Sequence, residues 1–130
     1  MRGFSLLELL VVLAVMALLG GLVGPNFVAL IARAEQRHAL ATLRDSLIQL
    51  PRAARLLGRT LVLDDVADAL TVGGQILVSP PAGWRLRFEP PLMVTREQLC
   101  SPSTVTVEDG QGGVLSVIDI EAPACGVSFQ

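Results

Sequence analysis

An unbroken run of uncharged residues near the N-terminus constrains this chain more than any other feature of its sequence. The twenty-four residues from position 9 to position 32 include no charged side chain. As an α-helix this run is about 36 Å long, and the hydrocarbon core of a bilayer is roughly 30 Å thick. The rest of so short a chain could hardly enclose a helix that is apolar on every side. The run therefore predicts a helix that inserts into a membrane.

A cleaved secretory signal is the main alternative for this run, and two features argue against it. The basic segment before it is only residues 1–3, and Glu8 lies near the start of the apolar stretch. An ordinary signal peptide has no use for a carboxylate there. Burial of a carboxylate in lipid costs on the order of a few kcal/mol unless it is paired, so Glu8 is a candidate functional residue.

The composition of the whole chain limits the classes of function. Hydrophobic residues make up 52% of the 130 residues and charged residues 17%, which excludes an intrinsically disordered chain, and the length excludes a multidomain enzyme. The chain has a single histidine, His38, and no motif that groups a nucleophile, a base and an orienting acid. We therefore expect neither an enzyme nor a protein that uses a cofactor.

A glycine, a phenylalanine and a glutamate stand at set offsets before the apolar run, as Gly3, Phe4 and Glu8. This arrangement resembles the class III signal of type IV pilins and of type II secretion pseudopilins. In that family a short basic leader, here with Arg2, ends in glycine, the mature chain begins with a methylated phenylalanine, and a glutamate follows four residues later. The resemblance is strong in the N-terminal segment and holds for the rest of the chain in outline.

The resemblance implies a processing step and a location. A prepilin peptidase of the bacterial inner membrane would cut after Gly3 and methylate the new amine of Phe4. The chain would cross that membrane once, with its C-terminal domain in the periplasm, although Arg33 and Arg37 after the span favour the opposite orientation by charge bias. The implied partners are other pseudopilins or pilins in a helical filament, the peptidase and an inner-membrane assembly platform.

For Glu8 the resemblance implies a role in assembly. In that family the glutamate is thought to meet the N-terminal amine of a neighbouring subunit. Four residues are one helical turn, so Glu8 and the amine of Phe4 would lie at the same end of the helix. Incorporation into a filament would then satisfy two charges that lipid leaves costly, which makes Glu8 a recruitment and register device and not a catalyst.

Helix-weakening residues cluster inside the apolar run, as Gly20, Gly21, Gly24 and Pro25. Glycine lowers helix stability by about 1 kcal/mol relative to alanine, and proline removes a backbone donor. Membrane helices tolerate such residues, so an ordinary kink is one interpretation. The resemblance implies another, in which the helix extends locally when the subunit leaves the membrane for the filament.

Apolar residues after the membrane run recur with the period of a helix. They follow one another at intervals of three or four positions: Leu40, Leu43, Leu47, Leu50, Ala54 and Leu57. This spacing predicts one narrow apolar stripe that packs on a sheet. Pro51 should kink or divide the helix, and Gly58 is expected to end it.

The same helical stretch is basic, whereas the remainder is acidic. Residues 33–59 include six arginines and two acids, and residues 60–130 include three arginines and nine acids. DNA-binding members of the resembled family are expected to carry basic residues near the C-terminus, but residues 121–130 have none. We therefore do not expect nucleic-acid binding, and we expect the arginines to face acidic surfaces of neighbouring subunits or lipid headgroups.

From Thr60 onward the pattern changes to short alternating runs. Residues 84–89 alternate strictly and predict a half-buried strand. Further strands are predicted at residues 61–63, 75–79, 92–95, 104–108, 114–120 and 126–129. Residues 64–70 are predicted as a short capped helix, Pro90 and Pro91 as a strand breaker, and residues 109–113 as a hairpin loop.

Cys100 and Cys125 are the only cysteines, and they flank the predicted hairpin. Pilins often close a C-terminal loop in this way, so the resemblance implies that the two residues pair in an oxidising periplasm. Two unrelated thiols are the alternative. Two cysteines without a nearby histidine do not favour a metal site. Calcium is not expected either, because no segment resembles the aspartate-rich, tryptophan–glycine segment of major pseudopilins.

Together these features predict an α+β, pilin-like fold in which a long N-terminal helix, kinked near Pro25 and Pro51, packs on a small antiparallel sheet. The predicted segments are a leader at 1–3, a membrane and filament-core helix at 4–32, a basic amphipathic half at 33–59 and a head domain at 60–130. The short length and the missing major-type segment indicate a minor pseudopilin of type II secretion. The alternatives are a minor type IV pilus subunit for adhesion, motility or DNA uptake, and a single-span membrane protein whose periplasmic domain binds a ligand or partner.

Overall fold

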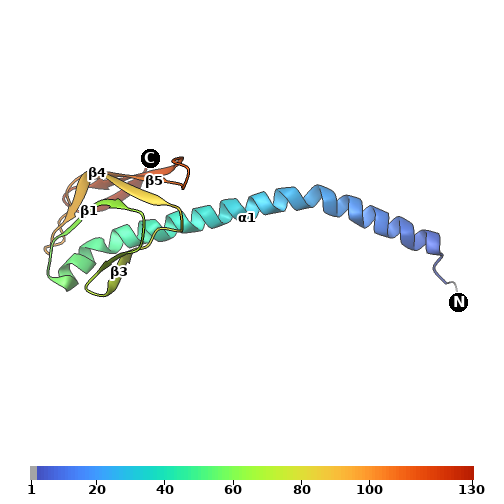
Figure 1. Cartoon of the computed structure of the whole chain (residues 1–130), viewed down its shortest axis with the longest axis horizontal. Helices are drawn as coiled ribbons and strands as arrows, with labels where there is room; N and C mark the ends of the chain where they lie inside the picture. Colours follow the sequence, from blue (N-terminus) through green and yellow to red (C-terminus); the bar gives the residue numbers. More distant parts are fainter. Residues whose placement is uncertain (1–2) are drawn as a thin grey trace. The chain divides into compact units, whose positions relative to one another are not determined.

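The computed structural model describes residues 3–130, which form one helix and seven strands. In chain order these are α1 (Leu6–Leu57), β1 (Leu61–Val66), β2 (Leu70–Val72), β3 (Gln75–Val78), β4 (Arg85–Val94), β5 (Ser103–Glu108), β6 (Val114–Glu121) and β7 (Gly126–Phe129) (Figure 1). A long N-terminal helix followed by a small antiparallel sheet is the α+β, pilin-like architecture predicted from the sequence. The chain divides into two compact units, Met1–Arg37 and His38–Gln130, so the second half of α1 belongs with the sheet.

In the first unit, α1 consists of the apolar run. Every residue from position 3 to position 35 is exposed, and α1 is long and apolar enough to cross a membrane. The helix continues through Gly24 and Pro25 without a break. Figure 1 shows the blue part of α1 changing direction before the cyan part begins. Pro25 has no N–H for the carbonyl of Gly21, which is an ordinary cause of such a bend.

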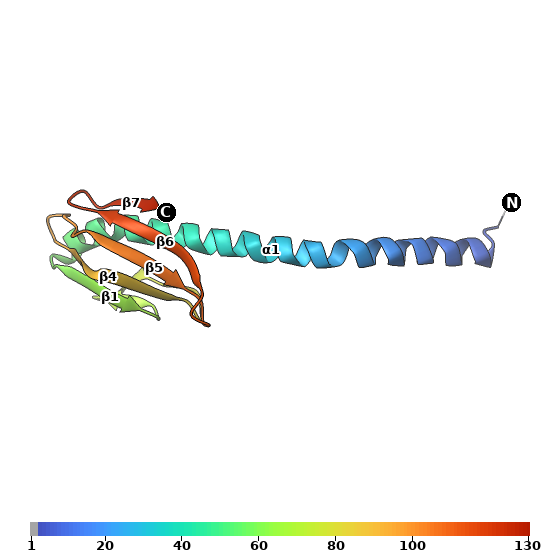
Figure 2. The same cartoon turned by 90° about the horizontal axis from the view of Figure 1, so that it is seen from above.

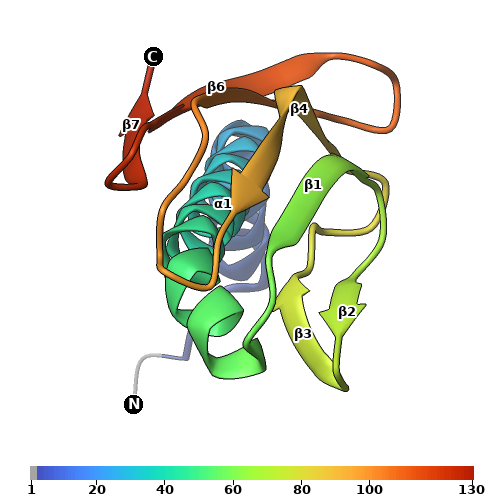
Figure 3. The same ribbon diagram turned by 90° about the vertical axis from the view of Figure 1, so that its left-hand side faces the viewer.

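In the second unit, the predicted apolar stripe of α1 is confirmed. Leu43, Leu47, Leu50 and Ala54 are buried, and Ala53 joins them. The end-on view of Figure 3 shows this part of α1 lying against the sheet. Pro51 was predicted either to kink the helix or to divide it. The helix is not divided there, because α1 continues through Pro51 to Leu57. A proline inside a helix costs about 3 kcal/mol, and the buried side chains on both sides of Pro51 hold the helix against the sheet.

The helix ends at Leu57, where Gly58 was expected to stop it. Gly58 has a φ of 64°, a left-handed conformation that glycine adopts without strain. The N–H of Gly58 donates to the carbonyl of Arg55 at 3.2 Å, and that of Arg59 donates to the carbonyl of Ala54 at 3.3 Å. These two bonds form a Schellman motif, which satisfies carbonyls at the end of the helix.

The main sheet has five antiparallel strands in the order β1-β4-β5-β6-β7, which Figure 2 shows side by side. Alternate residues of the central strands are buried, among them Leu86, Phe88, Val105, Val107 and Ile118. The residues between them face the other side of the sheet, as the period of a strand requires. The sheet therefore has one apolar face, which packs on α1, and one polar face.

The predicted short helix at residues 64–70 is wrong. β1 extends to Val66, which is buried, and a separate strand, β2, begins at Leu70. Asp65, assigned from the sequence to the helix, lies opposite Arg87 in the ladder between β1 and β4. Sheet pairing and the burial of Val66 override the capping preference of the aspartates, which is only a local effect.

Pro90 and Pro91 do not break the chain into two strands, contrary to the prediction, because β4 runs through both. The pairing of β4 with β5 ends at Glu89. The register of β4 with β1 shifts between Leu63, which lies opposite Leu92, and Asp65, which lies opposite Arg87. The prolines therefore occupy a stretch without ladder partners, where the missing N–H groups are not needed.

Two turns agree with the glycine pattern of the sequence. β2 and β3 are joined by Gly73 and Gly74, with φ values of 59° and 80°, as a two-residue hairpin requires. The predicted hairpin loop at residues 109–113 joins β5 and β6. A carboxylate oxygen of Asp109 accepts bonds from the N–H groups of Gln111 and Gly113, which stabilises this loop.

Candidate functional site: the N-terminal processing and assembly motif

The residues of the predicted cleavage site lie just before the helix. Gly3 and Phe4 precede α1, and Phe4 is 81% exposed. A Cβ built on Gly3 would meet no heavy atom within 4 Å. Arg2, the basic residue of the predicted leader, lies outside the described residues. The Gly3–Phe4 bond is therefore open to an enzyme that binds extended backbone.

Ser5 begins the helix, a role that we did not assign from the sequence. The N–H of Glu8 donates to the hydroxyl of Ser5 at 3.2 Å and to its carbonyl at 3.0 Å. A serine followed three residues later by glutamate is the spacing of a capping box, so this pattern could have identified Ser5. Because Ser5 follows Phe4, a cut after Gly3 leaves the cap in the mature chain.

Glu8 lies in the first turn of α1 and is exposed. A negative charge at this end of a helix is favoured by about 0.3 to 1 kcal/mol through the helix dipole. Among residues 3–130 the carboxylate of Glu8 forms no ion pair, and the side chains on either side of it, Leu7 and Leu9, are exposed and apolar. The site therefore presents a single carboxylate on an otherwise apolar helix surface.

The four-residue spacing of Phe4 and Glu8 predicts that the two residues share one helical turn. In the structure they do not. α1 begins at Leu6, so the backbone of Phe4 lies before the helix. A new amine on Phe4 would be attached to a non-helical residue, whereas Glu8 is fixed by the helix and by its bond to Ser5. The backbone of Glu8 is therefore held by the helix, whereas the backbone of Phe4 is not.

Among the described residues, 3–130, nothing packs against the glycines of the weak segment. A Cβ built on Gly20, Gly21 or Gly24 would meet nothing within 4 Å. Each glycine lowers helix stability by about 1 kcal/mol relative to alanine, and no contact within the described chain compensates.

The fold and the N-terminal site together define a pilin-like chain: an exposed apolar helix with a capped start and a glutamate in its first turn, followed by a helix-covered sheet. Residues 1–24 match the model of the prokaryotic N-terminal methylation motif, which is the class III prepilin signal. This match implies processing by a prepilin peptidase and assembly with pilins. No curated protein and no solved structure shows significant similarity to the chain.

A disulfide joins Cys100 and Cys125, the pair implied by the resemblance, across a Cα–Cα distance of 5.1 Å. The N–H of Cys100 also donates to the carbonyl of Pro123 at 3.1 Å, and Cys100 forms a β-bridge with Val94. The bond thus ties the segment after β4 to the turn between β6 and β7, which fastens the edge strand of the sheet.

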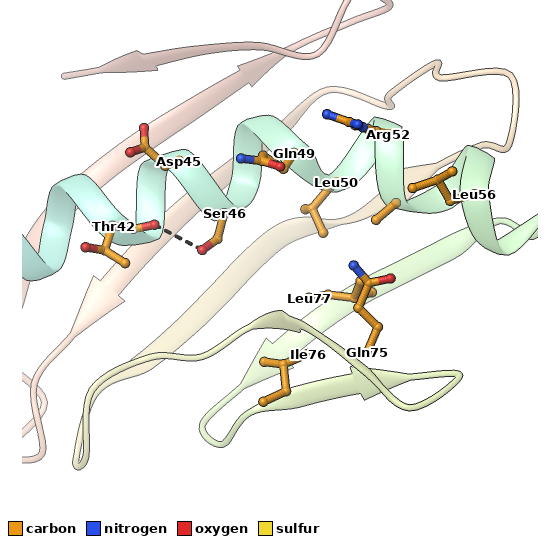
Figure 4. Close-up of a pocket in the computed structure, with 11 residues that line it drawn as sticks. Thr42, Asp45, Ser46, Gln49, Leu50, Arg52, Leu56, Gln75, Ile76 and Leu77 are labelled. Atoms are coloured by element: carbon orange, nitrogen blue, oxygen red, sulfur yellow. Dashed lines mark hydrogen bonds between the residues drawn. The ribbon is translucent and has the colours of Figure 1, made fainter.

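The second unit has an open groove between α1 and β3 (Figure 4). Leu50, Leu56 and Ile76 supply its apolar lining, beside the polar side chains of Thr42 and Ser46. The hydroxyl of Ser46 donates to the carbonyl of Thr42 at 3.0 Å. Within residues 3–130 no group of three or more His, Cys, Asp or Glu side chains could hold a metal ion.

The neighbouring side chains of Arg96 and Glu97 shift each other's pKa. The guanidinium of Arg96 donates to the carboxylate of Glu97 at 2.7 Å. This hydrogen bond and the attraction of the charges raise the pKa of Arg96, and the same hydrogen bond lowers the pKa of Glu97. Both side chains are more than half exposed and lie after β4, so the pair belongs to the surface of the second unit.

Proposed function

We propose that this chain is a structural subunit, a minor pseudopilin, of a periplasmic type II secretion filament. It is processed by prepilin peptidase, is assembled through its N-terminal helix and supports protein export without being an enzyme. The observation that carries the proposal is the methylation motif, placed at the exposed, capped start of an apolar helix with Glu8 in its first turn. The minor assignment is part of this proposal, because residues 60–130 include no stretch that resembles the aspartate-rich, tryptophan–glycine segment of major pseudopilins.

The membrane part of the proposal rests on the surface of α1. An apolar helix surface that is fully exposed in the isolated chain needs lipid or other helices around it. The inner membrane provides the lipid, and the core of a filament provides the other helices. The Cys100–Cys125 bond supports a periplasmic location for the second unit, because disulfides persist in oxidising compartments.

Filament assembly explains the position of Glu8. In lipid the carboxylate is costly and has no partner within the described chain, whereas a neighbouring subunit brings a free amine. The inner-membrane assembly platform would extract the helix, and the glycines and Pro25 would let it extend as it leaves the bilayer.

Mass spectrometry of the mature N-terminus tests the processing step. We expect a chain that begins with N-methylated Phe4 in cells with prepilin peptidase, and a chain that retains residues 1–3 in cells without it. A chain that keeps residues 1–3 in both strains, or that loses the whole apolar run, would contradict the proposal.

Replacement of the carboxylate tests the assembly step. The Glu8→Ala variant should be cut normally after Gly3 but should fail to join filaments, measured by cross-linking to neighbouring subunits in sheared fractions. The matched control is Glu35→Ala, since Glu35 is also an exposed glutamate of α1. Normal assembly of the Glu8→Ala chain would remove the recruitment role.

Deletion in the native bacterium tests the secretion assignment. We expect export of type II substrates into the medium to fall strongly, while surface pili and twitching motility persist. The opposite pattern, with loss of pili and normal export, would assign the chain to a type IV pilus.

A further inference from the structure

Three connecting segments meet at one end of the main sheet and enclose a pocket. They are the loop between β1 and β2, the turn before β4, and the loop between β5 and β6. The pocket has a volume of about 450 Å³, which is in the usual range for sites that bind small molecules. It lies within the second unit and shares no residue with the groove between α1 and β3. We call it the loop pocket.

An aromatic ring lines the loop pocket and is held in place. Trp84, the single tryptophan of the chain, lies directly before β4, and its side chain is partly buried against the core of the second unit. Its backbone N–H donates to the carbonyl of Pro81 at 3.0 Å, which fixes the turn. An indole offers a flat apolar face and one N–H donor. The pocket therefore contains a fixed aromatic surface.

Beside the ring, the loop pocket presents a hydrogen-bond donor and an acceptor together. Arg85 lies opposite Glu108 in the ladder between β4 and β5, with about 5 Å between their Cα atoms. Both side chains face the polar side of the sheet, because the neighbouring residues Leu86 and Val107 are buried. A guanidinium only donates, and a carboxylate only accepts. A ligand that satisfies both must therefore donate and accept at neighbouring atoms.

Ion pairs orient these two side chains and leave them able to bind a ligand. Nε of Arg85 lies 3.5 Å from a carboxylate oxygen of Asp65, and one carboxylate oxygen of Glu108 lies 3.7 Å from the guanidinium of Arg87. Both distances are longer than that of a normal hydrogen bond. The terminal nitrogens of Arg85 and the second carboxylate oxygen of Glu108 take no part in these pairs.

The third side of the loop pocket is a loop of fixed shape. The carboxylate of Asp109 accepts bonds from the N–H groups of Gln111 and Gly113 at 2.9 and 2.7 Å. Gly110 approaches the turn before β4 so closely that a Cβ built on it would lie 3.2 Å from the carbonyl oxygen of Gly83. A site whose walls are already ordered loses little conformational entropy when a ligand binds.

We propose that the loop pocket binds a pyranose ring of a glycan. The apolar face of the sugar stacks on the indole of Trp84, and adjacent hydroxyl groups, each both a donor and an acceptor, bond Arg85 and Glu108. An organic cation could also stack on an indole, but it has no acceptor for the guanidinium of Arg85. The inference adds a binding activity to the proposed function and takes from it only the compartment. Because the periplasm contains the glycan strands of the cell wall, we assign the wall as the source of the ligand.

Fluorescence of Trp84 tests binding in the full chain. The chain is held in micelles of a polyoxyethylene detergent, which has no sugar headgroup, and is titrated with chitotriose, a soluble trimer of N-acetylglucosamine. We expect a saturable shift of the emission, and no such shift with tetramethylammonium chloride. Because the chain has a single tryptophan, the signal reports on the loop pocket. No saturable shift with chitotriose, or an equal shift with the ammonium ion, would overturn the inference.

Substitution of the polar groups tests the site itself. Arg85→Ala and Glu108→Gln should each weaken the binding of chitotriose at least about fivefold, because a hydroxyl group of the sugar loses its charged partner. The matched control is Arg96→Ala, since Arg96 is also an exposed arginine paired with an acid but does not line the pocket. Its affinity should equal that of the parent chain. All three variants should keep the parent's denaturant unfolding curve nearly unchanged, because the ion pairs that they remove are exposed. Parent affinity in both pocket variants would overturn the site.

Sedimentation with purified cell-wall sacculi tests the source of the glycan. The parent chain should pellet with the sacculi, chitotriose should release it, and Arg85→Ala should remain in the supernatant. Binding of chitotriose without sedimentation would overturn the assignment to the wall. The outcome is separable from the proposed function, because these measurements need neither cleavage nor a filament. An uncut N-terminus in a chain that binds sacculi would contradict the proposed function alone, and normal processing and assembly without glycan binding would contradict the inference alone.

Discussion

The two units of this chain use the same helix in opposite ways. In the first unit α1 buries nothing, and its exposed surface is almost entirely apolar. In the second unit the same helix buries five residues against a sheet and exposes charged side chains. The first unit therefore depends on surroundings that other molecules supply, whereas the second contains its own core. Substitutions can separate these two kinds of stability.

The largest effect is expected in the core of the second unit. Phe88 is one of the largest buried side chains of the core. The substitution Phe88→Ala should therefore lower the free energy of unfolding by about 3 to 5 kcal/mol. Fluorescence of Trp84, the single tryptophan, can follow denaturant unfolding of the chain in detergent micelles. Membrane insertion should not change. Ile76→Ala, at a position 61% exposed, is the control and should have a much smaller effect. Equal effects would mean that the second unit lacks an independent core.

Loss of the disulfide is the next largest effect. Cys100→Ser with Cys125→Ser should lower the free energy of unfolding by about 3.5 kcal/mol in the chain-entropy model, for a sequence separation of 25. The same denaturant experiment measures it, and a reducing agent should destabilise the parent chain but leave the double variant unchanged. If reduction has no effect on the parent chain, the bond does not stabilise the second unit.

One substitution at two glycines of the same chain contrasts the units directly. Gly58→Ala places a Cβ at a φ of 64° and should lower the stability of the second unit by about 1 to 2 kcal/mol, with no steric contact involved. Gly21→Ala lies inside the apolar helix and should instead favour that helix by about 1 kcal/mol. Circular dichroism and Trp84 fluorescence separate the two changes. If Gly21→Ala shifted the unfolding of the second unit, the two units would not be independent.

Periodic parts of the fold could be predicted from the sequence, and parts that depend on partners could not. The spacing from Leu40 to Leu57 predicts the buried side of α1, and Gly58 marks its end. By contrast, Pro90 and Pro91 are strong local breakers, yet a shift in the pairing of distant strands lets β4 continue through them. Residues 64–70 include aspartates that could cap a helix, but Val66 is buried in the core as the last residue of strand β1.

The site shows the same division. Gly3, Phe4 and Glu8 are found by their spacing alone, and the Ser5 cap could have been found from its distance to Glu8. The closeness of Glu89 and Asp119 on the sheet could not be predicted, because the two residues lie thirty positions apart and only the register through Thr104 brings them together. Local sequence therefore predicts the N-terminal motif, and tertiary structure is needed for the surfaces of the second unit.

The smallest effect is expected from an exposed charge of the second unit. The hydrogen bond from Arg96 lowers the pKa of Glu97, so the pair stabilises the folded chain above the ordinary pKa of glutamate. This contribution is lost as the pH falls through the lowered pKa. It is small because the two side chains are 68% and 58% exposed and water screens their attraction. NMR titration of the Glu97 carboxyl should show a midpoint below the ordinary value, and Arg96→Ala should raise it, whereas Arg59→Ala should not. An unchanged midpoint in Arg96→Ala would mean that the bond does not persist in solution, and the exposed charges of this unit would then act only through contacts with other molecules.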